Sequence, residues 1–423
     1  MVESRPSSPQ ALAHRVIRMA GRDPDEPHRV ATPLELLFDL TFVVAFGVAA
    51  EQLAHLLAEG HLASGLLGFG FAMFAVCLAW INFSWFASAY DTDDWPFRVA
   101  TMVQMVGVLI FTLGLPDVFA SIDHGQQVNN AVSVAGYVVM RIAMGFQWLR
   151  AATQNPQRRS ACLTYLTTIL VAQAGWVLLL LVEASVSVPV TLLLMVPLAL
   201  IELAGPWIAE TRKGGTPWHA HHLAERYGLL AIIALGEGVI GTVASLAAVV
   251  EHQGWTLDAV LVGVAGTGLT FGMWWTYFII PSAGILQVHR ERFFAWGYGH
   301  ILIFAAIAGT GAGLHVAAFF IEDQTHIGVV ATVLSVAVPV GVFVLMVYTL
   351  HTWLVREADP FHLGLLVGTA AVLVAAVWLA AAGVPMAWCL LVVTLAPAVT
   401  VVGYEAVGHR HLAAILNRSL SRD

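Results

Sequence analysis

Apolar runs long enough to cross a membrane recur along nearly the whole chain. A helix of about 20 apolar residues crosses a hydrocarbon core of roughly 30 Å. Only 11% of the 423 residues are charged and 59% are hydrophobic, whereas soluble domains carry roughly a quarter charged residues. We therefore predict an all-α polytopic membrane protein with about twelve transmembrane helices, at 33–58, 64–90, 98–120, 129–150, 160–183, 188–209, 222–249, 257–280, 294–320, 327–354, 362–382 and 386–408.

The distribution of Lys and Arg predicts the orientation of these spans. The even-numbered connections contain basic residues, whereas the odd-numbered ones contain none and carry acids. Because cytoplasmic loops are enriched in Lys and Arg, both termini should lie in the cytoplasm of a cell (inner) membrane. Residues 1–31 are predicted to form a cytoplasmic polar tail, since they lack the apolar segment of a signal peptide. Residues 411–423 are predicted to form a second cytoplasmic tail.

The chain is predicted to contain two six-helix halves, 32–213 and 214–410. Glu35 aligns with Glu225 at an offset of 190 residues, and Trp80–Phe83 aligns with Trp274–Tyr277 at an offset of 194. Spans 1 and 7 both start on the cytoplasmic side, which predicts parallel repeats about an axis along the membrane normal. Chance alignment of aromatic-rich helices is the alternative explanation.

Polar and ionisable side chains inside the spans are candidate functional groups, because a charge in the bilayer core is costly. With about 1.5 Å of rise per helical residue, five of them fall in one layer near the midplane: Asn82, Arg141, Glu202, Glu237 and His300. Transporters place their coupling sites at this depth.

Glu35 and Asp39 lie four residues apart in the first span, and hence on one face of the helix. Two such carboxylates could share a proton or bind a hard cation. Glu35 could instead simply cap the start of the helix, where the dipole favours a negative charge. For Asp39 the alternatives are a functional role and a buried ion pair.

Glu237 is the strongest single candidate, because its flanking glycines, Gly236 and Gly238, would let another backbone approach. The alternative is a structural salt bridge between Glu237 and Arg141. Glu225 and Arg226 are predicted to form a buried charge pair with each other. His222 and Glu225 are one turn apart, but a His-Glu-x-x-His spacing is absent, so we predict no metal site.

Two further motifs have plain structural interpretations. The glycine run Gly309–Gly313 lies within a span, which favours helix packing over phosphate binding. The acidic segment Asp91–Asp94 is predicted to form a solvated turn that caps the next helix.

The motifs of enzymes and of nucleic-acid-binding proteins are absent from the sequence. It contains no nucleophile elbow, no dinucleotide fingerprint and no basic patch. The cysteines Cys77, Cys162 and Cys389 lie in apolar runs, which argues against disulfides and thiolate metal sites. We predict no enzymatic activity, no cofactor and no nucleic-acid partner. The expected partners are membrane lipids and an unidentified small ion or solute, with protons one candidate.

The chain resembles the bacterial low temperature requirement protein A family. The matching motifs are Thr32-Pro-Leu-Glu-Leu-Leu-Phe-Asp39, Ala224-Glu-Arg-Tyr-Gly228 with Leu235-Gly-Glu237, Tyr90-Asp-Thr-Asp-Asp-Trp95 and Trp296-Gly-Tyr-Gly-His300. Leu37 stands where a second aromatic residue is usual, and Gly238 where a serine often follows. The resemblance implies a multi-pass inner-membrane protein, and it marks as functional positions Glu35, Asp39, Glu225, Arg226, Glu237 and His300.

These features together predict a proton- or cation-coupled transporter or permease. Asp39 and Glu237 would carry the coupling charge, with Arg141 as counter-charge and His300 as a relay. Protonation would cancel a carboxylate's charge in the membrane core and let the halves rearrange. The alternative is a non-transporting membrane sensor or structural protein, in which the buried acids form packing ion pairs.

Overall fold

The computed structural model describes residues 16–27, 29–125, 127–183 and 185–413. These residues form 12 helical segments long and apolar enough to span a membrane, which confirms the predicted polytopic α-helical class. The spans are α1 (Pro33–Ala58), α2 (Leu62–Tyr90), α3 with α4 (Trp95–Leu113, Leu115–His124), α5 (Ala131–Gln154), α6 (Arg159–Glu183), α7 (Val188–Arg212), α8 with α9 (Ala220–Ala234, Gly236–Gln253), α10 (Leu257–Phe278), α12 (Phe293–Ile321), α13 (Val329–Val355), α14 (Pro360–Ala381) and α15 (Met386–Gly403). A short helix, α11 (Ser282–Val288), connects α10 to α12.

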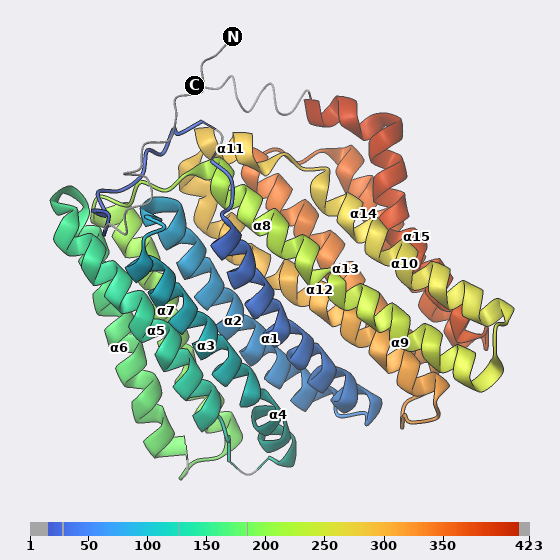
Figure 1. Cartoon of the computed structure of the whole chain (residues 1–423). Helices are drawn as coiled ribbons and strands as arrows, with labels where there is room; N and C mark the ends of the chain where they lie inside the picture. Colours follow the sequence, from blue (N-terminus) through green and yellow to red (C-terminus); the bar gives the residue numbers. More distant parts are fainter. Residues whose placement is uncertain (1–15, 28, 126, 184, 414–423) are drawn as a thin grey trace, which may run out of the picture.

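The helices form two groups that lie side by side, with α1, α2, α8 and α12 between them (Figure 1). Helix α1 packs against α2, α3 and α12, and α12 also packs against α9 and α13. In the first half the contacts run α1–α2, α1–α3, α3–α5, α5–α6 and α6–α7, and the second half repeats this order from α9 to α15. A duplication would produce this pattern, but neighbour order alone does not show that the halves superimpose, so the repeat stays a prediction.

Two spans that the sequence suggested were continuous are broken. The third breaks at Gly114, where Pro116 cannot donate a backbone hydrogen bond and α5 crosses closely. A Cβ on Gly114 would lie 2.5 Å from the backbone nitrogen of Ser133. The seventh breaks at Leu235, directly before the Gly236-Glu-Gly238 segment. This break places Glu237 in the first turn of α9 rather than in the middle of a continuous helix.

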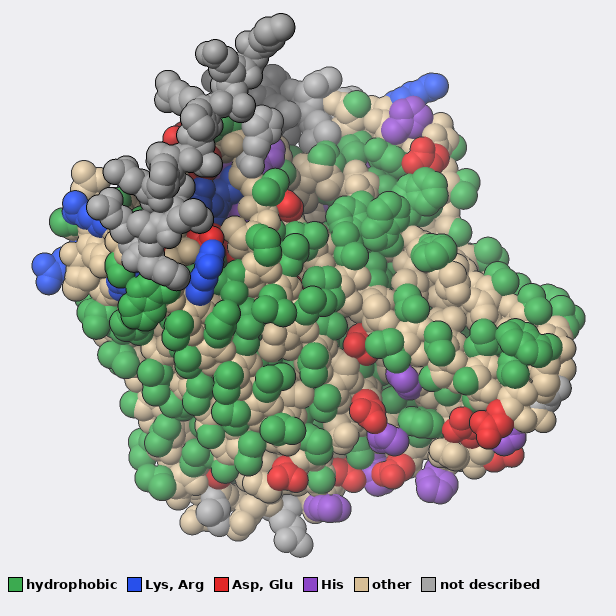
Figure 2. Space-filling model, viewed as in Figure 1, with side chains coloured by type: hydrophobic (Ala, Val, Ile, Leu, Met, Phe, Trp, Pro, Cys, Tyr) green, Lys and Arg blue, Asp and Glu red, His purple; other side chains and the backbone are tan. Residues whose placement is uncertain are grey.

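The two ends of the molecule differ in charge (Figure 2). Lys and Arg gather at the end where the described chain starts and finishes, whereas acids and histidines gather at the opposite end. We name the first end the basic face, defined by residues of the even-numbered connections, namely Arg158, Arg212, Arg290 and Arg356. The acidic face is defined by Glu59, Asp123, Glu251 and Glu322.

The N-terminal segment, residues 16–27 and 29–31, packs across the basic face. The backbone nitrogen of Ile17 donates to Asp94 at 2.8 Å, and that of Arg22 donates to the carbonyl of Ala89 at 2.9 Å. Asp94 also caps α3 and pairs with Arg150. The predicted capping is therefore confirmed. The predicted solvated turn is only partly right, because Asp93 is exposed whereas Asp91 and Asp94 are each only 5% exposed. The first 15 residues of the predicted tail lie outside the described residues.

Candidate functional site

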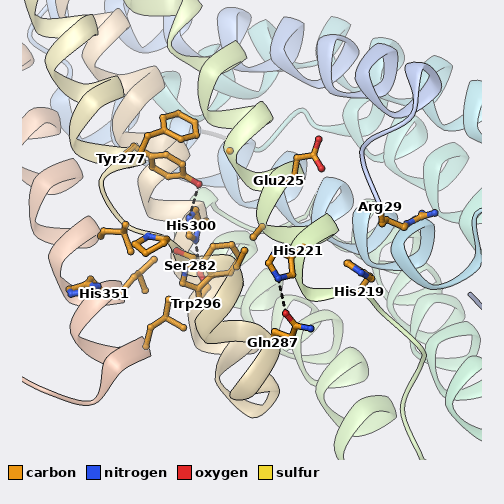
Figure 3. Close-up of a pocket in the computed structure, with 18 of the residues that line it drawn as sticks. Arg29, His219, His221, Glu225, Tyr277, Ser282, Gln287, Trp296, His300 and His351 are labelled. Carbon is orange, nitrogen blue, oxygen red and sulfur yellow. Dashed lines mark hydrogen bonds between the residues drawn. The ribbon is translucent and has the colours of Figure 1, made fainter. Parts of the chain in front are cut away.

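A cavity of about 720 Å³ extends from the basic face into the second half of the bundle. Its walls come from α8, α10, α11, α12, α13 and the N-terminal segment. Polar and aromatic side chains from these elements point toward the cavity (Figure 3). The lining side chains with polar or aromatic groups discussed below are Glu225, Tyr277, Trp296, His300 and His351.

His300 lies on the inner wall of the cavity and has a defined tautomer. Its Nδ1 is 2.7 Å from the carbonyl oxygen of Trp296, which can only accept, so Nδ1 carries the proton. Because His300 is buried within a span, the uncharged ring is favoured, and its other nitrogen, Nε2, then accepts the hydroxyl proton of Tyr277 at 3.1 Å (Figure 3). His300 is thus a neutral side chain whose ring joins α12 to α10.

Glu225 lines the cavity and is not paired with Arg226, so the predicted pair is wrong. Successive residues of a helix point about 100° apart, and Glu225 faces the cavity while Arg226 faces α1. The Glu225 carboxylate accepts one long hydrogen bond, 3.4 Å from the backbone nitrogen of Ala31. No described Lys, Arg or His forms an ion pair with it.

Arg226 instead joins the two halves of the chain. Its guanidinium lies 2.7 Å from Glu35 Oε1 and 2.5 Å from Asp39 Oδ1, both on α1. Trp80 also donates to Asp39 Oδ1 at 2.6 Å, and His222 Nε2 is 3.2 Å from Glu35 Oε1. All three charged side chains are fully buried. We name these five residues the Arg226 cluster.

The charge of the Arg226 cluster is unbalanced. Two carboxylates face one guanidinium, so uptake of one proton, on His222 or on a carboxylate, makes the cluster neutral. The capping alternative for Glu35 is confirmed, because its backbone and side chain form a capping box with Thr32. A proton or cation shared with Asp39 stays a prediction. Asp39 is in a buried ion pair with Arg226. His222 contacts Glu35 rather than Glu225.

Glu237 is buried at the helix break and does not contact Arg141. It is 6% exposed, and no described residue forms a hydrogen bond or ion pair with its carboxylate. Two glycines make room for it. A Cβ on Gly47 would lie 2.9 Å from Glu237 Oε1, and one on Gly311 would lie 2.8 Å from Glu237 Cβ. The predicted packing role of the glycine run is confirmed here, whereas the Glu237–Arg141 bridge is wrong.

Arg141 pairs with Glu202 in the interior of the first half. Glu202 also accepts hydrogen bonds from Tyr137 at 2.6 Å, Trp176 at 3.1 Å and Gln173 at 3.2 Å. This arrangement satisfies a buried carboxylate completely and has the character of a packing ion pair. Nearby Asn82 donates to the carbonyl of Leu78 on its own helix.

The predicted midplane residues therefore do not form one site. Asn82, Arg141 and Glu202 line one small void in the first half, His300 lines the large cavity, and Glu237 lies apart from both. Sequence reasoning missed Tyr277 and His351. His351 was detectable as an ionisable residue within the apolar run 327–354, and Tyr277 lies in the aligned segment Trp274–Tyr277.

The described residues include one set of three side chains close enough to hold a metal ion: Glu59, His61 and Asp123. This set lies on the acidic face and outside the cavity. His222 and Glu225 do not belong to it.

Twelve candidate spans around buried ion pairs and a deep cavity define a polytopic α-helical membrane protein. Residues 30–397 match the family model described as bacterial low temperature requirement A protein (LtrA), so the chain belongs to that family. It is also similar to the uncharacterized protein RA0937 of Rhizobium meliloti (strain 1021). The two are 25% identical over 295 residues, which cover 66% of this chain and 67% of the relative. Neither comparison names an activity.

Proposed function

We propose that this protein is a proton- or cation-coupled transporter or permease of the inner membrane. The observation that carries the proposal is the cavity, which reaches from the basic face to buried His300. Small-molecule sites typically occupy roughly 300–1,000 Å³, and this cavity, at about 720 Å³, is of that size. The solute would enter from the basic face, which the positive-inside rule assigns to the cytoplasm together with both termini.

The Arg226 cluster is the proposed coupling element between the halves. It joins α1 to α8 through fully buried charges, and Arg226 is the direct neighbour of cavity residue Glu225. Its charge balance depends on one proton, so protonation would change how strongly α8 is held against α1. A solute at Glu225 and a proton in the cluster would act on two different faces of the same helix, about 100° apart.

Glu237 is the second proposed coupling residue. A buried carboxylate without a partner is stable in the membrane core mainly in its neutral form. Its position at the break between α8 and α9 would let a change in its charge alter the angle between these helices. The positive end of the α9 helix dipole favours the charged carboxylate, whereas burial favours the neutral one. These two influences act in opposite directions on Glu237.

The alternative is a non-transporting membrane sensor or structural protein. The Arg141–Glu202 pair favours it, because the Glu202 carboxylate is fully hydrogen-bonded and the pair lines only a small void. In this alternative the Arg226 cluster also serves only packing, and the cavity transports nothing.

Proton flux into proteoliposomes under an imposed pH gradient tests the proposal, across a panel of cations and small metabolites. Wild type is compared with Glu237→Gln and Asp39→Asn. Glu251→Gln is the matched control, since Glu251 is exposed on the same helix as Glu237. We expect flux that requires the protein, is lost in both test variants and persists in the control. If no condition gives flux and the two test variants are only less stable than wild type, the transporter proposal is rejected. Asp39 and Glu237 would then have structural roles only.

A further inference from the structure

We infer that the cavity binds a small organic amine in its protonated form, with an aromatic or apolar body. This inference names the solute class of the proposed transporter and therefore rests on that proposed function. It follows from the cavity-lining groups that have no hydrogen-bond or ion-pair partner within the protein.

Most polar groups of the cavity already have partners within the protein. Arg29 donates to the carbonyl of Ala87 and lies 3.9 Å from the carboxylate of Asp91. His219 contacts the carbonyl of Glu26 through Nε2 and the backbone nitrogen of His222 through Nδ1. His221 contacts Gln287 at 2.7 Å. These groups have little capacity left for a ligand.

The groups that remain are mainly acceptors. Glu225 has a carboxylate with one long hydrogen bond and no ion pair. Tyr277 donates its hydroxyl proton to His300, so its oxygen lone pairs remain free. His351 is 3% exposed, and neither of its ring nitrogens has a hydrogen-bond partner. These nitrogens have almost no surface open to the cavity, so His351 shapes the wall and does not contact the ligand.

Charge excludes an anion and favours a cation. No cationic side chain among the described lining residues is left without a partner, since Arg29 is paired, whereas the carboxylate of Glu225 is not. An ammonium group donates to the carboxylate of Glu225, and its positive charge suits the aromatic side chains Tyr277 and Trp296, which line the same cavity. A bare metal cation would use the carboxylate but not the aromatic wall or the large volume.

Isothermal titration calorimetry on the purified full-length protein tests this inference with matched probes. 2-Phenylethylamine is the cation, 2-phenylethanol is its neutral counterpart and 3-phenylpropionate is the anion. We expect the amine to bind at least tenfold more tightly than the alcohol, and the anion to bind most weakly. The trimethylated amine keeps the charge but loses the N–H donors, so it should bind between the amine and the alcohol.

The variants locate the site. Glu225→Gln should weaken amine binding at least tenfold and leave alcohol binding unchanged, because it removes the charge and keeps the shape. Glu251→Gln, on the acidic face, is the control and should bind like wild type. Equal affinities for amine and alcohol, no amine binding at millimolar concentration, or an unaffected Glu225→Gln would overturn the inference.

The outcome is separable from that of the flux experiment. Amine binding that depends on Glu225, with no flux under any gradient, would support the amine site and reject the transporter. Proton-coupled flux of other solutes, without amine binding, would support the transporter and reject the amine.

Discussion

Removing the charge of Arg226 should destabilise the protein more than removing that of Asp39. In Arg226→Gln, Glu35 and Asp39 would both remain in a fully buried position without their cation. Breaking a buried ion pair from one side costs about 3–5 kcal/mol, because an uncompensated charge stays behind. In Asp39→Asn, Arg226 keeps Glu35, and the new amide oxygen can still accept from Trp80. The lost charge-assisted bond should cost about 1.5–3 kcal/mol.

The double variant Arg226→Gln/Asp39→Asn makes the test sharper. Only Glu35 then remains as a carboxylate, and His222, at 3.2 Å, can neutralise it by taking a proton. The double variant should therefore cost less than the sum of the single variants, with a coupling energy of about 1–3 kcal/mol. Reversible unfolding in mixed micelles, followed by circular dichroism, measures all three. Strict additivity, or equal costs for the two single variants, would refute the assignment of Arg226 as the shared partner.

Three further variants test other parts of the structure. Gly311→Ala should destabilise by about 1–3 kcal/mol in the same assay, because a Cβ there would force α12 away from Glu237; an unchanged stability would contradict that close contact. Burial, aided by the negative charge of Glu35, raises the pKa of Asp91 from its ordinary 3.8 to about 6. The protonated form is thus favoured on folding, so this stabilisation is present below pH 3.8 and is lost as the pH rises through 6. Asp91→Asn should remove this pH dependence, and an unaltered profile would reject it. Tyr277→Phe should cost about 1 kcal/mol and, in two-dimensional NMR of labelled histidine, change the Nε2 signal of His300 but not the Nδ1 signal.

Much of the fold could be predicted from the sequence because membrane spans are a local property. A run of apolar residues has to be helical in lipid, wherever it packs, and each predicted span corresponds to a helix. The breaks at Gly114 and Leu235 were not predicted. They depend on close crossings with other helices, such as the contact between Gly114 and Ser133, which a single span does not reveal.

The candidate site was predicted as a set of residues but not as an arrangement. Helical spacing places Glu35 and Asp39 on one face, and it separates Glu225 from Arg226. It does not show which distant helix each face meets, and Arg226 lies 187 residues from Asp39. Depth alone suggested that Arg141 and Glu237 could pair, but residues at one depth can lie in different halves. His351 was overlooked because its significance depends on the cavity beside it.

The most direct test of the transporter account is the side from which the inner end of the cavity can be reached. Ile303 lines that end, and the native cysteines Cys77, Cys162 and Cys389 are buried. In Ile303→Cys, a membrane-impermeant maleimide would be applied to each face of reconstituted vesicles with and without a pH gradient. The control Ser282→Cys lies at the cavity mouth and should react only from the basic face. The account predicts that Ile303→Cys reacts from the basic face in one condition and from the acidic face in another. Reaction from the basic face alone in every condition would contradict transport through this cavity.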